Sequence, residues 1–321
     1  MAGVDIAAVL EAAEVAEHNC AGYVRPEANV GLWLGLALGE LARRGRDKLT
    51  LIVDPPIEAF GAWLEQLVAG STGEAGGILL VADEPPAEDA AGYGADRMFV
   101  HLRNDEAPDP ANDARLREVA TAGHPTIVMG AMGAADLGRL FYFAEFATAV
   151  AGWVLEVDPF DHPDAEAAGD ATRRALEGDA PAPDDGDLGA VLGPALAPPG
   201  YLAVMSYLPP GDDVDAAVGR LRAAVLRERA VATTFAQGPR LGRAAGRPVA
   251  GGSPAGRVLQ LVEDGAAEEP VPGRPSGFRS LLAAQADAEL QALRDRGLPA
   301  ARVRIPAGDV VAGIDSLTTK V

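Results

Sequence analysis

Short apolar runs alternate with longer amphipathic segments along the first half of the chain. Runs rich in aliphatic and β-branched residues predict buried strands at 48–53, 78–82, 98–102 and 126–129. The segments that contain helix-spaced apolar residues predict helices at 32–44, 57–69, 111–122 and 135–155. Because continuous apolar strands separated by helices are typical of parallel sheets covered on both faces, we predict a doubly wound α/β domain here.

The second half has a different order of predicted strands and helices, and no internal repeat of the first half is evident. Its signals follow in the order strand 201–208, helix 213–229, strand 230–236, strand 257–262, helix 277–296 and strand 301–305. A β-α-β-β-α-β order is typical of the ferredoxin-like split motif. We therefore predict a smaller ferredoxin-like α+β unit over residues 201–306.

Segments without such patterns set the expected domain boundaries. Residues 178–200 are rich in Pro, Gly and Asp, and they are predicted to link the first domain, 1–177, to the second unit. Gly238–Gly256, between the middle strands of the second unit, is rich in Gly and Pro and is predicted to be a long loop. The tail, 307–321, has no strong pattern and is expected to be loose.

The charge balance narrows the classes of partner. A net charge of −20 argues against nucleic acid and anionic membranes, since both require a basic surface. A phosphate-bearing ligand would then need a local group of Arg side chains or backbone N–H groups. No apolar stretch approaches the roughly 20 residues that span a bilayer, and the acidic N-terminus is unlike a secretory signal. The expected location is the cytoplasm.

Cysteine and histidine usage gives no support for a metal or a cofactor. Cys20 is the single cysteine, which excludes a disulfide within one chain. The four histidines are scattered, without the paired spacing of a zinc site: His18, His101, His124 and His162. No metal and no cofactor are expected.

Several short motifs occur in the order of one known family. They are GRDKLT at 45–50, FGAWLEQL at 60–67, STG at 71–73, EFATAVAG at 145–152, DPFDHP at 158–163, ATT at 232–234, GPR at 238–240 and AQA at 284–286. Together they resemble the glucose-6-phosphate isomerases that some bacteria carry fused to a transaldolase. The matches span about Asn29 to Ile305, nearly the whole chain.

The resemblance implies a fold and a place in metabolism. Residues up to about 176 would form a sugar-isomerase (SIS) domain, and the protein would belong to the carbohydrate metabolism of glycolysis and gluconeogenesis. Enzymes of this kind normally carry two SIS domains, and the phosphate-binding loops of the first would precede Asn29. Only 28 residues do so here, so the resemblance implies a chain that lacks the first domain.

The same resemblance implies that the catalytic side chains are lost. Gly70 stands where the family has the glutamate base, and Leu140 stands where it has a histidine or glutamate. Gly169 takes the place of the catalytic lysine, and the GQLHKGG loop reads GRPVAGG at 246–252. The chain has only two lysines, Lys48 and Lys320, so no catalytic residue is predicted.

Four residues are candidates for substrate binding. Ser71 and Thr72 could form an anion-binding turn or, alternatively, a polar helix end. His162, with Asp161, could be a retained acid–base pair or part of a turn stabilised by Asp and Pro. Arg240 is the best candidate for holding an anion, with a structural role as its alternative. A Gly/Pro-rich segment at 251–256 is either a phosphate cradle or an ordinary loop. Trp33, Trp63 and Trp153 are expected in the core.

Three functions fit these observations. The first is a non-catalytic accessory or regulatory subunit that pairs with an active isomerase or another sugar-phosphate enzyme, or that forms a homo-oligomer. The second is an active glucose-6-phosphate isomerase, completed by a separate subunit, which would require an exposed apolar face on the first domain. The third is a module that binds a sugar phosphate without turnover. The sequence leaves open whether the chain is an enzyme.

Overall fold

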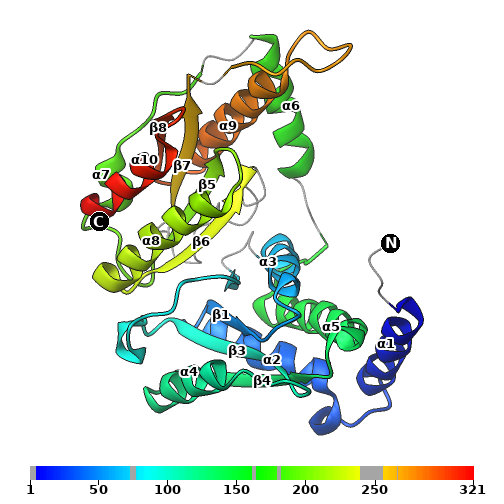
Figure 1. The fold of residues 1–321 in the computed structure, drawn as a ribbon. Helices are drawn as coiled ribbons and strands as arrows, with labels where there is room; N and C mark the ends of the chain where they lie inside the picture. Colours follow the sequence, from blue (N-terminus) through cyan, green and yellow to red (C-terminus); the bar gives the residue numbers. More distant parts are fainter. Residues whose placement is uncertain (1–4, 73–76, 161–163, 179–181, 239–255, 266) are drawn as a thin grey trace. The chain divides into compact units, whose positions relative to one another are not determined.

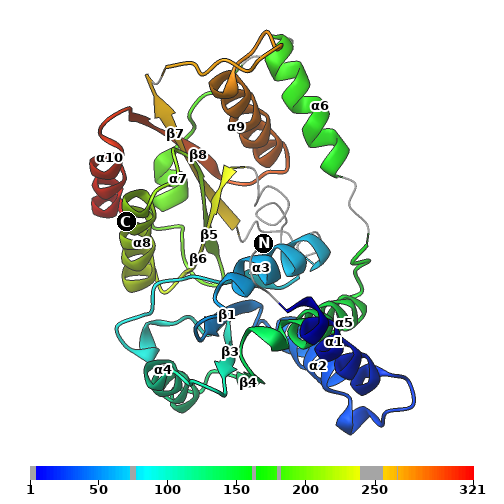
Figure 2. The same cartoon turned by 45° about the vertical axis from the view of Figure 1, so that its right-hand side comes forward.

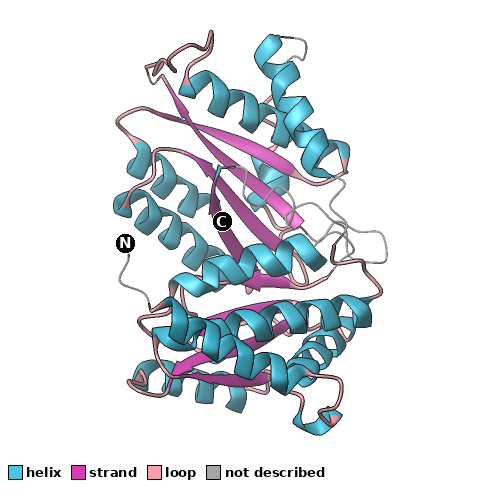
Figure 3. Ribbon diagram, turned by 90° about the vertical axis from the view of Figure 1, so that its right-hand side faces the viewer, coloured by secondary structure: helices cyan, strands magenta, loops and turns pink. Residues whose placement is uncertain are grey.

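The computed structural model describes residues 5–72, 77–160, 164–178, 182–238, 256–265 and 267–321. The chain forms two compact units, and each has its own parallel sheet (Figure 1). The first comprises residues 1–83, 89–91 and 95–161, and the second comprises 84–88, 92–94 and 162–321. Both sheets are purely parallel with helices alongside (Figure 3), which confirms the α/β class predicted for the first half.

The first unit contains four parallel strands in the order β2-β1-β3-β4. The strands are β1 (Lys48–Val53), β2 (Leu79–Val81), β3 (Arg97–Asn104) and β4 (Thr126–Ala131). The helices are α1 (Ile6–Cys20), α2 (Val30–Arg43), α3 (Ala59–Thr72), α4 (Pro110–Thr121) and α5 (Leu137–Leu155). Every strand predicted from its apolar run is present, because strands buried on both faces leave little room for polar residues.

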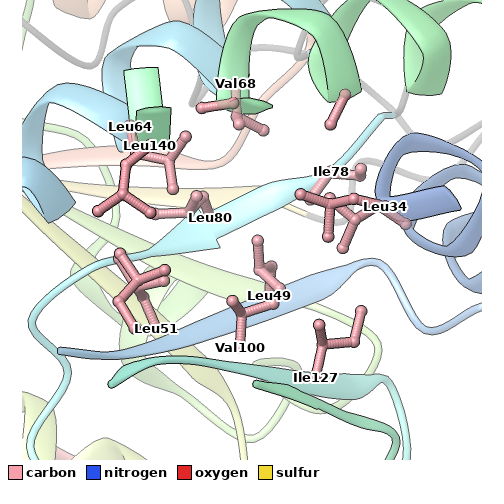
Figure 4. Close-up of a cluster of buried hydrophobic side chains, with 14 of the residues drawn as sticks. Leu34, Leu49, Leu51, Leu64, Val68, Ile78, Leu80, Val100, Ile127 and Leu140 are labelled. Carbon is pink, nitrogen blue, oxygen red and sulfur yellow. The ribbon is translucent and has the colours of Figure 1, made fainter. Parts of the chain in front are cut away.

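One face of this sheet carries the apolar core. Alternate residues of β1 and β3, including Leu49, Leu51 and Val100, pack against α2, α3 and α5 (Figure 4). The opposite face is covered by α4 and is more polar. Lys48, Arg97 and His101 are buried on β1 and β3. Lys48 is in register with Arg97, and His101, four residues farther along β3, is in register with Ile52.

Three glycines bring α2 and α5 unusually close. Gly31, Gly35 and Gly39 are spaced four apart, so they line one side of α2. A Cβ atom added to Gly35 would lie 2.6 Å from the carbonyl oxygen of Ala147 on α5. The two helices lie side by side in Figures 1 and 2.

The tryptophan prediction is wrong for two of the three residues. Trp63 is half-buried and packs edge-on against Phe141. Trp33 is 52% exposed and Trp153 is 74% exposed. Trp33 lies roughly opposite the glycine face of α2, and the helix buries the glycines instead.

The second unit has four strands in the order β6-β5-β7-β8. The strands are β5 (Tyr201–Tyr207), β6 (Ala232–Gln237), β7 (Gly256–Asp264) and β8 (Ala300–Pro306). The helices are α6 (Asp164–Glu177), α7 (Leu188–Leu192), α8 (Asp212–Arg229), α9 (Phe278–Asp295) and α10 (Val310–Leu317). All three strand pairings are parallel. The ferredoxin-like α+β prediction is therefore wrong, because that motif requires antiparallel neighbours.

The division of the chain also differs from the expected boundaries. Helix α6 packs along α9 and belongs to the second unit (Figure 2). The segment expected to be a linker contains α7, and Val191 and Leu192 are buried in the second core. The tail expected to be loose forms α10, whose Ile314 and Leu317 lie in the same core. Apolar side chains at helical spacing explain both differences.

The two units share one topology, which the sequence pattern did not reveal. In each, the first strand pairs with the second and the third, and the third pairs with the fourth. In each, helices follow the first, third and fourth strands: α3, α4 and α5 in one unit, and α8, α9 and α10 in the other. No helix among the described residues is long and apolar enough to cross a membrane.

Candidate functional site

The carboxyl ends of β1 and β3 form the place where a site is expected in the first unit. The chain leaves β1 toward β2 on one side, while β3 lies on the other, so the strand order reverses there. Ligands of open α/β sheets bind in the crevice at such a reversal. Asp54 follows β1 directly, and Asn104 is the last residue of β3.

Asp54 is the centre of a buried polar cluster at this edge. Its Oδ1 accepts from Nε2 of His101 at 2.9 Å and from Nδ2 of Asn112 at 2.8 Å. Its Oδ2 accepts from the backbone N–H groups of Asn104 at 3.1 Å and Asp109 at 3.2 Å. Burial alone would raise the pKa of this carboxyl, but the four hydrogen bonds outweigh burial and lower it below the usual 3.8.

His101 lies between two carboxylates. Nε2 faces Oδ1 of Asp54, and since a carboxylate only accepts, Nε2 carries the proton of that hydrogen bond. Nδ1 is 3.9 Å from Oδ1 of Asp113 and has no hydrogen-bond partner among the described residues. Arg103 binds Asp113 through two nitrogens, at 3.0 and 3.3 Å, and these bonds lower the pKa of Asp113.

This cluster has the chemistry of a structural clamp. His101 and Asp54 are fully buried, and every carboxylate oxygen of Asp54 is engaged within the unit. The cluster ties the ends of β1 and β3 to α4. Both side chains are enclosed by the unit, so neither is exposed at its surface.

The turns after β1 and β5 are unsuited to phosphate. In α/β proteins phosphate binds at a helix N-terminus, through free backbone N–H groups. Here Asp54-Pro55-Pro56 precedes α3, and Pro209-Pro210 precedes α8. Proline has no N–H to donate. The first turn of α8 also carries Asp212, Asp213 and Asp215, whose charge opposes an anion.

Two predicted substrate-binding residues lie at the opposite, C-terminal end of α3. Thr72 is buried, and its hydroxyl donates to the carbonyl of Val68 and accepts from the N–H of Ile78. Those contacts agree with the alternative predicted for Thr72, a polar helix end, because the hydroxyl secures the end of α3 to the segment before β2. Ser71 precedes it in the last turn. The helix dipole is negative at a C-terminus and disfavours an anion there.

The remaining predicted site residues are not brought together in the described part of the chain. His162, Arg240 and residues 246–252 lie outside the described residues. Gly70 lies in α3 and Gly169 in α6, in different units. Leu140 is 1% exposed and lines an apolar cavity of about 40 Å³ in the first core. Lys48 is buried, with Nζ 2.6 Å from Oδ2 of Asp47.

A second polar network lies on the α9 face of the second sheet. The hydroxyl of Tyr207, the last residue of β5, donates to Oε2 of Glu289 on α9 at 2.5 Å. Burial raises the pKa of Glu289 to about 7, against the lowering effects of Tyr207 and Arg296. Burial also raises the pKa of Tyr207.

None of these groups stands out in the sequence as a site residue. The available signals were a histidine inside an apolar strand and an acid beside the buried side of an amphipathic helix, at His101 and Glu289. From the sequence alone, His101 and Glu289 could equally have been isolated, exposed residues. Among the described residues, no group of three or more His, Cys, Asp or Glu side chains is placed to hold a metal ion.

Comparisons with known proteins give distant structural likenesses. No protein-family model matches the chain, and no curated protein matches it. Among solved structures, a hypothetical protein from Thermus thermophilus, TT0462, is 14% identical, with a TM-score of 0.32, over 97% of this chain and 88% of that one. The C-terminal domain of glucosamine-fructose-6-phosphate aminotransferase from Francisella tularensis is 9% identical, with a TM-score of 0.31, over 99% and 94%. With identities and TM-scores this low, these likenesses assign the chain to no family.

Proposed function

We propose that the chain is a non-catalytic relative of the glucose-6-phosphate isomerases that acts in the cytoplasm as an accessory subunit of carbohydrate metabolism. One observation carries the proposal: the positions that would supply base and acid–base group hold side chains without proton-transfer chemistry. Gly70 has no side chain to accept a proton, and Leu140 is enclosed by the apolar core of the first unit.

The replacement of the family's catalytic lysine by Gly169 supports the same interpretation. Lys48 is held by Asp47 inside the first unit, and Lys320 lies at the end of the chain. General acid–base catalysis contributes about 10²–10⁴-fold per group, and preorganised charge contributes a comparable factor. A chain without base and cation is expected to leave the isomerisation near its background rate.

The electrostatics favour an accessory role over phosphate sensing by the strand-to-helix turns. Both turns combine proline, which has no N–H, with acidic residues, whose charge opposes an anion. Arg240, three positions after β6, stays the proposed contact for a sugar phosphate. Ser71 and His162 stay secondary proposals, because Ser71 lies at the C-terminal end of α3, where the helix dipole disfavours an anion, and His162 lies outside the described residues.

Turnover is the first test. The purified chain is assayed for conversion of fructose 6-phosphate to glucose 6-phosphate in a coupled reaction. A mock purification from an isomerase-null host is the control. We expect no rate above the mock preparation. A clear rate that follows the protein through purification would overturn the proposal, since groups other than those at 70, 140 and 169 would then do the chemistry.

Ligand binding is tested separately by calorimetry with fructose 6-phosphate and glucose 6-phosphate. Arg240→Ala is compared with Arg227→Ala, which removes an exposed arginine of α8 paired with its neighbour Glu228. If Arg240 holds the phosphate, only the first substitution abolishes saturable binding. Equal binding in both variants would remove Arg240 from the proposal.

An active isomerase completed by a separate subunit is a second candidate, because the first unit exposes large apolar side chains. Trp33 on α2, Trp153 on α5 and Phe160 beyond it are 52, 74 and 80% exposed. Such residues are enriched in protein interfaces. Mixing the chain with a separately expressed SIS domain and measuring isomerisation tests this alternative. A gain in rate that Trp153→Ser removes would support it, and no gain would leave the accessory role.

A further inference from the structure

Helix α9 is held to the second sheet by apolar and polar contacts. The buried apolar side chains of α9 are Ala284, Ala286, Leu290 and Leu293. On the same side, Tyr207 of β5 and Val262 of β7 cluster with Ala286. The other face of this sheet is packed by α7, α8 and α10 through a separate apolar cluster. Polar contacts between α9 and the strands add to its apolar packing.

Three polar contacts fasten one turn of α9 to three different strands. Nε2 of Gln260 on β7 donates to the carbonyl of Ala286 at 2.9 Å. Nη1 of Arg302 on β8 lies 2.7 Å from Oδ1 of Asp287. Tyr207 on β5 donates to Glu289. Nε of Arg302 also donates to Oε1 of Gln260 at 2.8 Å, so two of the contacts are linked to each other.

The Tyr207–Glu289 contact ends in a carboxyl group whose pKa is near neutral. The Gln260 contact carries no charge, and Arg302 and Asp287 neutralise each other. Burial raises the pKa of Glu289 to about 7, even though the Tyr207 hydrogen bond and the charge of Arg296 both lower it. An ionised Glu289 is therefore a buried charge that the folded helix holds at a cost.

The other charged groups around this turn are already engaged or lie in solvent. On β7 and β8, Glu263 pairs with Arg279, and Arg304 pairs with Asp185. On α9 itself, Arg294 binds Asp184 and the carbonyl of Ala300. The charged side chains that the structure describes on α6 are exposed, and they are Asp170, Arg173, Arg174 and Glu177.

We propose that the network of Tyr207, Glu289, Gln260, Arg302 and Asp287 is a protonation-dependent clasp for α9. With Glu289 neutral, α9 stays docked on the sheet, together with α6, which packs along it. With Glu289 ionised, the helix opens more readily, because opening returns the carboxylate to water.

The direction in which pH changes the opening of α9 follows from the linkage between protonation and folding. The folded-state pKa of Glu289, about 7, is above its reference value of 4.5. Its stabilising contribution is therefore full below about pH 4.5 and is lost as the pH rises through about 7. For an opening that fully hydrates the carboxylate, the opening equilibrium of α9 should rise on the order of 50-fold between about pH 5 and pH 8.

Hydrogen exchange of the full chain tests this directly. Protection factors are measured by mass spectrometry at pH values from about 5 to 8, corrected for the intrinsic pH dependence of exchange. We expect protection of residues 278–295 to fall with rising pH by on the order of 50-fold, while α8 keeps its protection. A pH-independent α9 in the wild-type chain would overturn the proposal, whatever the behaviour of the variants.

Two variants identify the group responsible. Glu289→Gln removes the titration and keeps an acceptor for Tyr207, so its α9 protection should be high and flat with pH. Asp295→Asn removes an exposed carboxylate from the same helix and should keep the wild-type pH dependence. If Glu289→Gln retains that dependence, another group is responsible and the clasp is wrong.

Discussion

Gly35 sets the distance between α2 and α5, and its replacement should be costly. In Gly35→Ala, the added Cβ would lie within 2.6 Å of the Ala147 carbonyl and of Val150 Cβ. Because backbone has to move, the free energy of unfolding should fall by about 1–3 kcal/mol, as measured by urea denaturation. Gly219→Ala is the matched control in α8, where a Cβ meets nothing within 4 Å. It should gain up to about 1 kcal/mol. Equal effects of the two substitutions would show that the close approach is unimportant.

Asp54 should make the first unit sensitive to acid. Its folded-state pKa is lowered, so its contribution is present above the usual value of 3.8 and is lost as the pH falls through the lower folded value. Asp54→Asn turns an amide N–H₂ toward donors that the carboxylate satisfied. The free energy of unfolding should fall on the order of 3 kcal/mol near neutral pH.

The pH profile separates this effect from simple damage. Between about pH 2 and pH 5, the Asp54→Asn chain should lose less stability than the wild type. Urea denaturation at several pH values measures both slopes. Glu145→Gln changes an exposed acid of α5 and should match the wild type. The assignment to Asp54 fails if the variant keeps the wild-type slope.

At the scale of elements, the first core has room for one more methyl group. The apolar cavity of about 40 Å³ is bounded by α2, α3, α5 and the sheet, and Val100 of β3 is part of its wall. Val100→Ile should fill it and raise the free energy of unfolding by about 0.8 kcal/mol. Val258→Ile, at a fully buried position of β7 that does not line this cavity, should be neutral or cost about 1–3 kcal/mol. Thermal or urea unfolding measures both, and a loss in Val100→Ile would mean that the cavity is too constricted to accept the group.

Strands and helices were predictable from the sequence where the hydrophobic periodicity is strong. The relative direction of the strands was not predictable. The apolar runs at 48–53 and 201–208 predicted β1 and β5 within a residue. The order β-α-β-β-α-β fits both an antiparallel split motif and a parallel sheet, because it does not specify the path between the middle strands. The connection from β6 to β7 exceeds the dozen or so residues that a parallel crossover needs. That length was the signal that the ferredoxin-like prediction overlooked.

The site was less predictable than the fold, for a physical reason. Motif matching located Ser71 and Thr72. It could not show that the Thr72 hydroxyl already forms hydrogen bonds with the backbone of Val68 and Ile78. The Asp54–His101 cluster depends on pairing between β1 and β3, which are separated by more than forty residues in sequence. Only the register of the sheet brings those side chains together.

At the scale of the whole molecule, the two units repeat one strand order but differ in what they bury. In each, the face that carries the helix after the third strand is the polar one: α4 meets the Asp54–His101 cluster, and α9 meets the Tyr207–Glu289 network. Each unit also turns from its first strand into a helix through a pair of prolines. The shared plan places a polar cluster beside the helix that follows the third strand of each unit, and both turns carry prolines and acidic residues that disfavour phosphate.

Separate cores predict separate unfolding. The apolar cluster of the first unit and that of the second draw on different elements, and each sheet pairs its strands within one unit. All three tryptophans, Trp33, Trp63 and Trp153, lie in the first unit, so tryptophan fluorescence reports that unit, while far-UV circular dichroism reports both. In Gly35→Ala, the fluorescence midpoint in urea should fall by roughly 1 M, and the dichroism curve should split into two phases. The earlier phase should coincide with the fluorescence change, and the later one should keep the wild-type midpoint. A single transition seen by both probes in this variant would contradict the prediction. It would mean that the units unfold together, coupled by a free energy larger than the stability lost in Gly35→Ala.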